Sequence, residues 1–251
     1  MRLALLATLP IALILAACGS GTAAGSNTSS EQPAGVLPHC RSGTTAVGSK
    51  QFAVAAVARR PLRAYRQPGG HPFAHFGVRN QNGFATVFRV LAVRRKGCRP
   101  AWYRVQLPLR PNGITGFVKA ANVELGPVRT RIYVSVSARK LILLRKGRPV
   151  LRTTVAVGSS RTPTPTGNYY VNQRLIPADT SGPFGPGAIG ISAFSNVLTG
   201  WTQGGPIAIH GTNEPWSIGH AVSNGCIRVR NPVLRRLFRS TPAGTPVVIG
   251  R

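Results

Sequence analysis

Hydrophobic and polar residues alternate in short stretches along most of the chain, which is the pattern of β-strands rather than helices. Four such stretches lie in the first half, at residues 52–58, 84–93, 102–107 and 116–125. Turn residues rich in Gly, Pro and Asn separate them, as at Asn82-Gly83. Short apolar stretches bounded by turn signals predict a small all-β unit.

The second half continues the β pattern after Gly126-Pro127, where we expect a domain boundary. Residues 131–158 predict a hairpin around a Lys146-Gly147 turn, followed by a third β segment. Further strands are expected at 168–175, 188–192, 206–210 and 245–250. The expected fold class is therefore all-β, with two successive domains at residues 37–126 and 127–251.

One helix is predicted, at residues 231–238. Asn231 is the expected N-cap and Pro232 the first helical residue, the position where proline is best tolerated. The apolar residues at 233, 234, 237 and 238 then line one helical face.

Composition supports this fold class. The 251 residues include 29 Gly and 21 Pro, which disfavours an all-α bundle, while 43% hydrophobic residues suffice for one or two packed domains. There are 32 Lys+Arg against 4 Asp+Glu, a formal net charge of +28. Taken alone, this charge would suggest a nucleic-acid partner.

The N-terminus changes that interpretation. Residues 1–18 begin with one positive charge at Arg2, continue as an apolar run and end in small residues before a cysteine, as export signals do. Leu15-Ala16-Ala17-Cys18 resembles the lipobox of bacterial lipoproteins, which implies that the Cys18 thiol is lipidated after cleavage. An ordinary cleaved signal or an uncleaved anchor is the alternative. Residues 19–36 are small and polar, which is typical of a flexible tether.

Export makes nucleic acid an unexpected partner. We expect a protein that is lipid-anchored to the outer face of the bacterial cell membrane. Its arginine-rich surface would then meet anionic lipid head groups or cell-wall polymers.

Four cysteines divide among three uses. With Cys18 assigned to lipid and Cys226 to the motif described below, Cys40 and Cys98 are expected to form a disulfide in an oxidising compartment. The alternative is two unpaired buried thiols.

The first β unit carries a recognisable pattern. Trp102-Tyr103-Arg104-Val105, then Gly113, then Thr115-Gly116-Phe117-Val118 resembles bacterial SH3-like domains. The resemblance implies that residues 37–126 bind cell-wall peptide or brace the neighbouring domain. A spacer without a binding function is the alternative.

The candidate chemistry lies in residues 207–231. A thiol becomes a nucleophile when a neighbouring imidazole removes its proton, and a flanking glycine exposes it on a turn. Cys226 follows Gly225, and His210 ends an apolar strand upstream. Without a side chain at Gly225, backbone amides of the turn can point at a developing oxyanion.

These residues carry a second resemblance. His210-Gly211-Thr212, Ile218-Gly219 and Ser223-Asn224-Gly225-Cys226-Ile227-Arg228 resemble the signature of the L,D-transpeptidase catalytic domain, the YkuD family. Residues 162–167 and 182–185 are similar to earlier motifs of that family. The family fold is a β-sandwich with a small helical element, which agrees with the strands and helix predicted above.

The resemblance implies a thiol acyltransferase acting on peptidoglycan stem peptides, without a cofactor. Cys226 would attack the carbonyl of the third stem residue and expel the terminal D-alanine. A side-chain amine of a second stem would then resolve the thioester and form a 3→3 cross-link. His210 would act as base and then acid, oriented by the backbone carbonyl of Gly211.

Several neighbours receive roles from the same motif. The expected oxyanion or acyl pocket comprises Ser223, Asn224 and Gly225. Many family members have His where this chain has Asn224, so that position departs from the common pattern. The residues expected to bind substrate are Thr212, Arg228, Tyr170 and Trp216.

Other residues offer rival roles. His220 is an alternative base six residues before Cys226, and Glu214 either orients His210 or is an exposed loop acid. His39, His71 and His75 lie in the first unit and lack the Cys and Asp neighbours of a metal site.

Two further functions stay open. The same scaffold could act as an L,D-carboxypeptidase if water resolves the thioester. A non-catalytic cell-wall-binding lipoprotein is the third hypothesis.

Overall fold

The computed structural model describes residues 42–251. The expected export signal, Cys18, the tether, His39 and Cys40 lie outside these residues. Within the described part, no helix is both long and apolar enough to cross a membrane. Residues 42–251 belong to one compact unit.

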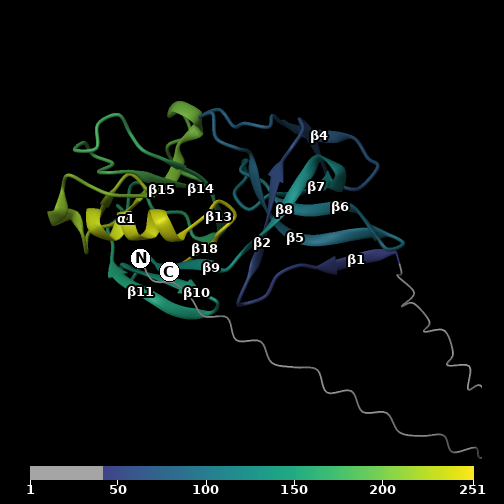
Figure 1. The fold of residues 1–251 in the computed structure, drawn as a ribbon. Coiled ribbons are helices and arrows are strands. Elements are labelled where there is room, and N and C mark those ends of the chain that lie inside the picture. Colours follow the sequence, from purple (N-terminus) through teal and green to yellow (C-terminus); the bar gives the residue numbers. More distant parts are fainter. Residues whose placement is uncertain (1–41) are drawn as a thin grey trace, which may run out of the picture. The chain divides into compact units, whose positions relative to one another are not determined.

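The first half of the described chain forms one antiparallel sheet (Figure 1). Its strands follow the order β4-β3-β7-β6-β5-β2-β8, and β1 pairs with β5. Alternate side chains turn inward and bury a core that includes Phe88, Val105 and Val118. The strands are β1 (Gly43–Ala46), β2 (Ala53–Ala58), β3 (Leu62–Tyr65), β4 (Pro72–Phe76), β5 (Val87–Lys96), β6 (Arg99–Gln106), β7 (Thr115–Lys119) and β8 (Val123–Val128).

The predicted strand at 116–125 is interrupted. A 3-10 turn at Ala120–Asn122 divides it into β7 and β8, which pair with different neighbours. Three strands that the sequence pattern missed, β1, β3 and β4, are only four or five residues long. Such short stretches show too few alternations for the pattern to stand out.

The second half forms a sheet in the order β11-β10-β9-β18-β13-β14-β15-β17. Its strands enclose the larger core, which includes Ile132, Ile209 and Ile227. They are β9 (Thr130–Ser135), β10 (Lys140–Arg145), β11 (Arg148–Thr154), β13 (Gly167–Leu175), β14 (Ala188–Phe194), β15 (Pro206–His210), β17 (Ile227–Arg228) and β18 (Pro246–Gly250). A separate parallel pair joins β12 (Val157–Gly158) to β16 (Ala221–Ser223). The expected all-β class with one short helix is confirmed for the described residues.

The turn between β10 and β11 shows why the sequence folds locally as it does. Lys146 and Gly147 have φ values of 50° and 79°. Two left-handed residues in succession match the twist of a tight hairpin, so the predicted Lys146-Gly147 turn is confirmed.

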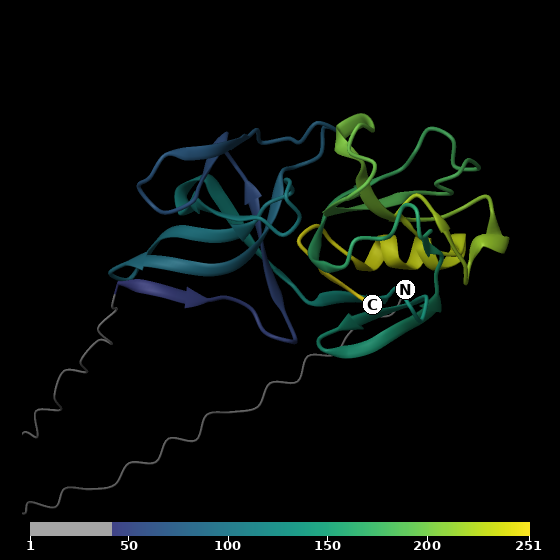
Figure 2. The same cartoon turned by 180° about the vertical axis from the view of Figure 1, so that it is seen from behind.

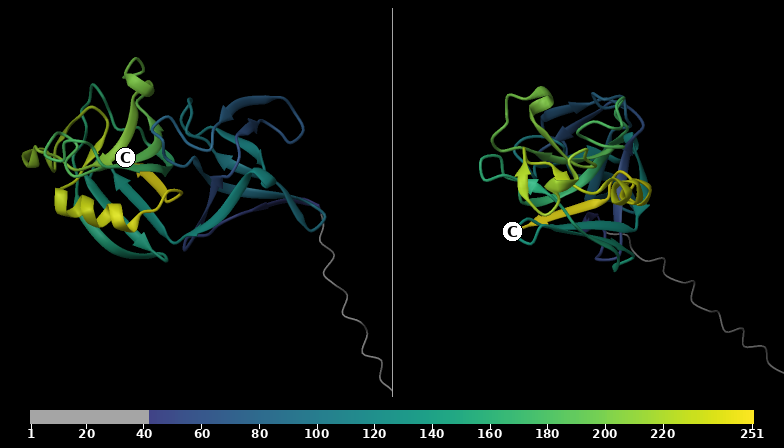
Figure 3. Two further views of the ribbon diagram at one scale, coloured as in Figure 1. Left: turned by 45° about the horizontal axis from the view of Figure 1, so that its top comes forward. Right: turned by 90° about the vertical axis from the view of Figure 1, so that its left-hand side faces the viewer.

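The last strand of the chain lies in the interior of the sheet. β18 lies between β9 and β13, parallel to the first and antiparallel to the second (Figure 3). A buried hydrogen bond of 3.0 Å between the hydroxyls of Thr130 and Thr245 joins the starts of this pairing. The C-terminal segment is therefore a structural member of the second core.

The single helix α1 (Asn231–Ser240) lies against β14 and β15 and buries Leu234 and Leu237 (Figure 2). The prediction of Asn231 as N-cap is wrong: the cap position is Arg230, and no side chain caps the helix. Asn231 Oδ1 instead accepts a 2.8 Å hydrogen bond from the Thr212 backbone amide. An Asn-Pro sequence suits both arrangements, so only the tertiary fold distinguishes them.

Polar contacts join the first sheet to β13, β14 and the segment after β14. The Gln106 side chain donates to the Asn168 carbonyl, and Asn112 pairs with both backbone groups of Phe194. Arg110 donates to the carbonyls of Ser195 and Gly204 at 2.6 Å each. A small apolar cluster around Ala55 and Val128 adds to this contact.

Core packing in the second sheet predicts a large stability effect. Ile132 is fully buried between β10 and β18, so Ile132→Ala should lower the free energy of unfolding by about 2–5 kcal/mol. Val150→Ala on exposed β11 is the control and should cost less than about 1 kcal/mol. Urea unfolding of both variants measures the difference. Equal losses would contradict the assigned core.

Candidate active site

Two parallel strands bring the candidate nucleophile and base together. β15 pairs with β17 so that Ile209 lies opposite Ile227 and His210 opposite Arg228. The two isoleucines point into the core. Because side chains alternate along each strand, the residues directly before and after each isoleucine point to the opposite face of the sheet. Cys226, just before β17, therefore shares a face with His210 and Arg228 and is a diagonal neighbour of His210.

His210 is held in one orientation. The residue is 4% exposed, and Nδ1 lies 2.6 Å from the carbonyl oxygen of Gly211. A carbonyl only accepts hydrogen bonds, so the neutral ring carries its proton on Nδ1 and leaves Nε2 as a base. The Phe184 ring packs edge-on against the imidazole at 4.9 Å. The Gly211 contact expected from the sequence is present.

Burial keeps the imidazole neutral. The pKa of His210 is lowered from 6.5 to about 4, mainly by desolvation on burial and to a smaller extent by the nearby positive charge of Arg228. The Gly211 carbonyl acts in the opposite direction because it favours the protonated ring. At neutral pH the ring can accept a proton.

Cys226 is a partly buried free thiol. Burial raises its pKa, while a hydrogen bond from the Ala208 backbone and the charge of Arg228 lower it. The resting pair is therefore a neutral thiol beside a neutral imidazole. Such a pair suits nucleophilic attack in which the base takes the thiol proton.

The turn before Cys226 depends on glycine. Gly225 has φ +108°, a conformation that residues with a side chain rarely adopt. Ser223 Oγ accepts from the Gly225 amide at 3.2 Å and donates to the Cys226 carbonyl at 2.6 Å. Since Ser223 and Gly225 are buried, they shape the turn, while Asn224 is exposed on it.

The loop at residues 158–164 holds this turn through hydrogen bonds. Thr164 Oγ1 donates to the Gly225 carbonyl at 2.9 Å and accepts from the Gly158 amide at 2.8 Å. Thr162 Oγ1 donates to the Ser223 carbonyl at 3.0 Å. The motif at residues 162–167 thus supports the nucleophile turn through its threonine hydroxyls.

The loop after His210 is fastened equally closely. Thr212 is buried, its amide bonds Asn231, and its hydroxyl accepts the Glu214 amide at 2.9 Å. A Cβ on Gly185 would collide with Asn231 Oδ1 and approach the Thr212 amide to 2.8 Å. The motif at 182–185 therefore packs on this loop, and the Thr212 hydroxyl is used within the protein.

Arg228 and Glu214 form an ion pair. Their side chains are 18% and 44% exposed, and Arg228 Nε is buried without a hydrogen-bond partner. The carboxylate thus contacts the guanidinium, and His210 takes its orienting contact from Gly211. This finding removes the reason to assign Glu214 a triad role.

The remaining predicted residues fall in different places. Tyr170 is fully buried and so offers no surface to a substrate, which contradicts its expected role. Trp216 lies on the 3-10 turn Pro215–Ser217 and is 63% exposed. His220 is an exposed loop residue.

The sequence predicted a disulfide between Cys40 and Cys98 and no metal site. Cys98 is disulfide-bonded, and its pairing with Cys40 stays a prediction because Cys40 lies outside the described residues. Within residues 42–251 no cluster of three His, Cys, Asp or Glu side chains is arranged to hold a metal ion.

Sequence reasoning did not foresee the contacts of two residues that hold the site. Asn231 joins α1 to the loop after His210, and Thr164 joins residues 158–164 to the nucleophile turn. Each partner is at least 19 residues away in the chain. No local pattern announces such contacts.

Residues 129–249 match the model of the L,D-transpeptidase catalytic domain, YkuD. A Bacillus subtilis relative named as an L,D-transpeptidase, YkuD, is 40% identical over 120 residues, which are 48% of this chain and 65% of that protein. The Escherichia coli L,D-transpeptidase YcfS is 34% identical over 110 residues, 40% of this chain and 32% of that protein. A solved L,D-transpeptidase of Enterococcus faecium aligns with TM-score 0.36 and 26% identity, covering 48% of this chain and 49% of that one. The similarity thus spans less than two thirds of each of these proteins.

The lowered pKa of His210 predicts acid destabilisation. Between pH 6.5 and 4 the unfolded chain binds a proton that the folded imidazole refuses, so stability falls as pH falls. The full shift corresponds to roughly 3 kcal/mol. In His210→Gln the loss of unfolding free energy between pH 6.5 and 4 should be smaller by about that amount. Exposed His220→Gln should show the same dependence of unfolding free energy on pH as the wild type. An unchanged slope in His210→Gln would refute the prediction.

The charge of Arg228 predicts the reactivity of the thiol. Arg228→Gln removes a positive charge that lowers the pKa of Cys226, so that pKa should rise. Alkylation of Cys226 by iodoacetamide at pH 8, followed by mass spectrometry, should slow several-fold. Exposed Arg230→Gln, two residues further, is the matched control. Faster alkylation in Arg228→Gln would show that the charge acts otherwise.

Proposed function

We propose that residues 129–249, which match the model of the L,D-transpeptidase catalytic domain, are such a domain, and that the protein forms 3→3 cross-links between peptidoglycan stem peptides. The observation that carries the proposal is the shared face of β15 and β17. It presents Cys226 beside an imidazole whose proton is fixed on Nδ1. The proposed activity is that of a cysteine acyltransferase without a cofactor.

In the proposed first half-reaction, Cys226 Sγ attacks the carbonyl carbon of the third stem residue. Its proton passes to His210 Nε2, which is neutral at the start. A C–S bond forms, and the carbonyl oxygen becomes an oxyanion. The backbone amide of Cys226, which follows the Gly225 turn, is the proposed donor to that oxyanion.

Collapse of the tetrahedral intermediate breaks the C–N bond to the terminal D-alanine. His210 returns its proton to the departing nitrogen, so the D-alanine leaves with a neutral amino group and the thioester remains. The Gly211 carbonyl favours the protonated ring, and thus stabilises the imidazolium that exists between these steps.

The second half-reaction mirrors the first. A side-chain amine of another stem attacks the thioester and gives its proton to His210, and the C–S bond breaks. Cys226 then regains a proton from the imidazolium. One peptide bond is lost and one is formed, so no external energy source is needed.

The protein's surroundings form part of the same proposal. Lipidation at Cys18 would hold the catalytic domain at the outer face of the cell membrane, with residues 19–36 as a tether. An SH3-like unit at 37–126 would add contact with the wall. The net charge of +28 supports a location beside anionic lipids or wall polymers.

Product analysis tests the function. The full chain in detergent is incubated with purified disaccharide-tetrapeptide, and the products are identified by mass spectrometry. We expect a dimer that has lost one D-alanine. Cys226→Ala should reduce its formation by at least about 10³-fold, and His210→Gln by about 10²- to 10⁴-fold. His220→Gln, an exposed histidine in the same segment, is the matched control.

Two other results would redirect the interpretation. A Cys226-dependent tripeptide without dimer identifies a carboxypeptidase, in which water resolves the thioester. If neither product nor an acyl adduct forms, the proposal is wrong and the wall-binding lipoprotein takes its place.

A further inference from the structure

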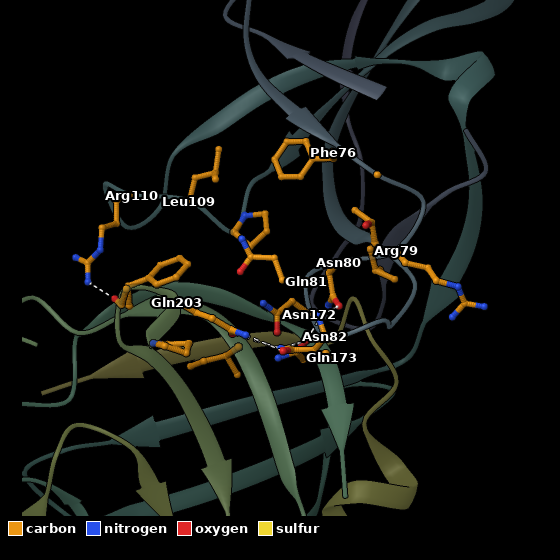
Figure 4. Close-up of a pocket in the computed structure, with 18 of the residues that line it drawn as sticks. Phe76, Arg79, Asn80, Gln81, Asn82, Leu109, Arg110, Asn172, Gln173 and Gln203 are labelled. Atoms are coloured by element: carbon orange, nitrogen blue, oxygen red, sulfur yellow. Dashed lines mark hydrogen bonds between the residues drawn. The ribbon is translucent and has the colours of Figure 1, made fainter. Parts of the chain in front are cut away.

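A cavity of about 460 Å³ lies where residues 75–82 and 108–110 meet β13, β14 and the segment before β15. Figure 4 shows its polar wall, with the amide side chains of Asn80, Asn82, Gln173 and Gln203 pointing toward one another. Phe76 and Leu109 form an apolar wall across from them (Figure 4). Its volume is in the range of small-ligand sites.

The four amides form a connected chain. Gln173 Oε1 accepts from Asn80 Nδ2 at 2.7 Å and from Asn82 Nδ2 at 3.1 Å. Gln203 Nε2 donates to Asn82 Oδ1 at 2.7 Å. Each primary amide offers two donors and an acceptor, so capacity for hydrogen bonding is left over for a ligand.

A fifth amide lacks any partner. Asn172 Oδ1, which lines the same cavity, is buried and accepts no hydrogen bond. A buried acceptor left unpaired is unfavourable, because it has lost its hydrogen bonds to water.

The nearby cations are already engaged by the protein. Arg110 donates to the carbonyls of Ser195 and Gly204, and Arg79 donates to the Gly83 carbonyl at 2.7 Å. Both guanidinium groups bond backbone oxygens, and His75 also lines the cavity, while the polar wall itself is built of neutral amides. Neutral amides beside an apolar wall suit a ring that carries hydroxyl and acetamido groups on its edge and C–H groups on its face.

A row of cross-strand neighbours runs from Gln173 in this cavity to the thiol. Gln173 lies opposite Gly190, and Gly190 lies opposite Ala208. The register of β15 with β17 places Ala208 level with Cys226. A Cβ on Gly190 would lie 2.8 Å from Gln173 Cγ, which shows that both residues use the same face. Three strand spacings make this row about 14 Å long.

We propose that this cavity binds the N-acetylated sugar to which the donor stem peptide is attached. The inference rests on the proposed function, which places the third stem residue at Cys226. Three extended residues and the lactyl link to the sugar span about 10–14 Å, which matches the row from Cys226 to Gln173.

Binding of a sugar without a stem peptide tests the site. The probe is the disaccharide N-acetylglucosaminyl-N-acetylmuramic acid, titrated by calorimetry into the full chain carrying Cys226→Ala, so that binding is measured without chemistry. We expect saturable binding that weakens at least about fivefold in Asn82→Ala and in Gln203→Ala. Both residues lie on exposed turns, so the two variants give independent measurements. Gln67→Ala, an exposed amide outside the cavity, should bind as the parent does.

Turnover separates this inference from the proposed function. The wild-type chain should use disaccharide-tetrapeptide with a lower KM than free tetrapeptide, and Gln203→Ala should reduce that preference. Cys226-dependent turnover without sugar binding, or sugar binding that both cavity variants leave unchanged, would overturn the sugar site alone. Displacement of the disaccharide by free tetrapeptide would assign the cavity to peptide and also overturn it. Sugar binding with no turnover of either substrate would support the sugar site and refute the proposed transpeptidase activity.

Discussion

The parallel pairing of β15 with β17 is the constraint on which the candidate site depends. Neither strand is long, and β17 has two residues, yet their register aligns Ile209 with Ile227. Burying these two isoleucines in one core forces the alternate residues, His210 and Cys226, onto the other face. A shift of one residue in β17 would turn Cys226 into the core and expose Ile227. The energy of core packing thereby fixes the geometry of the thiol and the imidazole.

Contacts distant in sequence hold the ends of these strands. Asn231 fastens the loop after His210, and the hydroxyl of Thr164 fastens the turn before Cys226. Both use side chains to satisfy backbone groups that leave the sheet ladder. Gly185 permits the close approach on one side, and Gly225 permits the turn on the other. The site is thus supported by short polar side chains and glycines, with few charged groups.

A site with few charged groups suits a chain with 4 acidic residues. Glu214 is paired with Arg228, and Glu124 with Arg59, so neither carboxylate orients His210. A backbone carbonyl performs this task without bringing a second charge into a buried place. The charge of Arg228 lowers the pKa of the Cys226 thiol, against the larger opposing effect of burial.

The sequence by itself determined the β class, the position of the helix and the candidate nucleophile and base. These follow from local alternation, from helix periodicity and from the motif around His210 and Cys226. The tertiary structure decided what is not local: the interruption between β7 and β8, the burial of Tyr170 and the cross-link made by Asn231. It also decided that Gln173, Gly190 and Ala208 form one row toward Cys226. Strand register arises from the packing of a whole core, and no single segment encodes it.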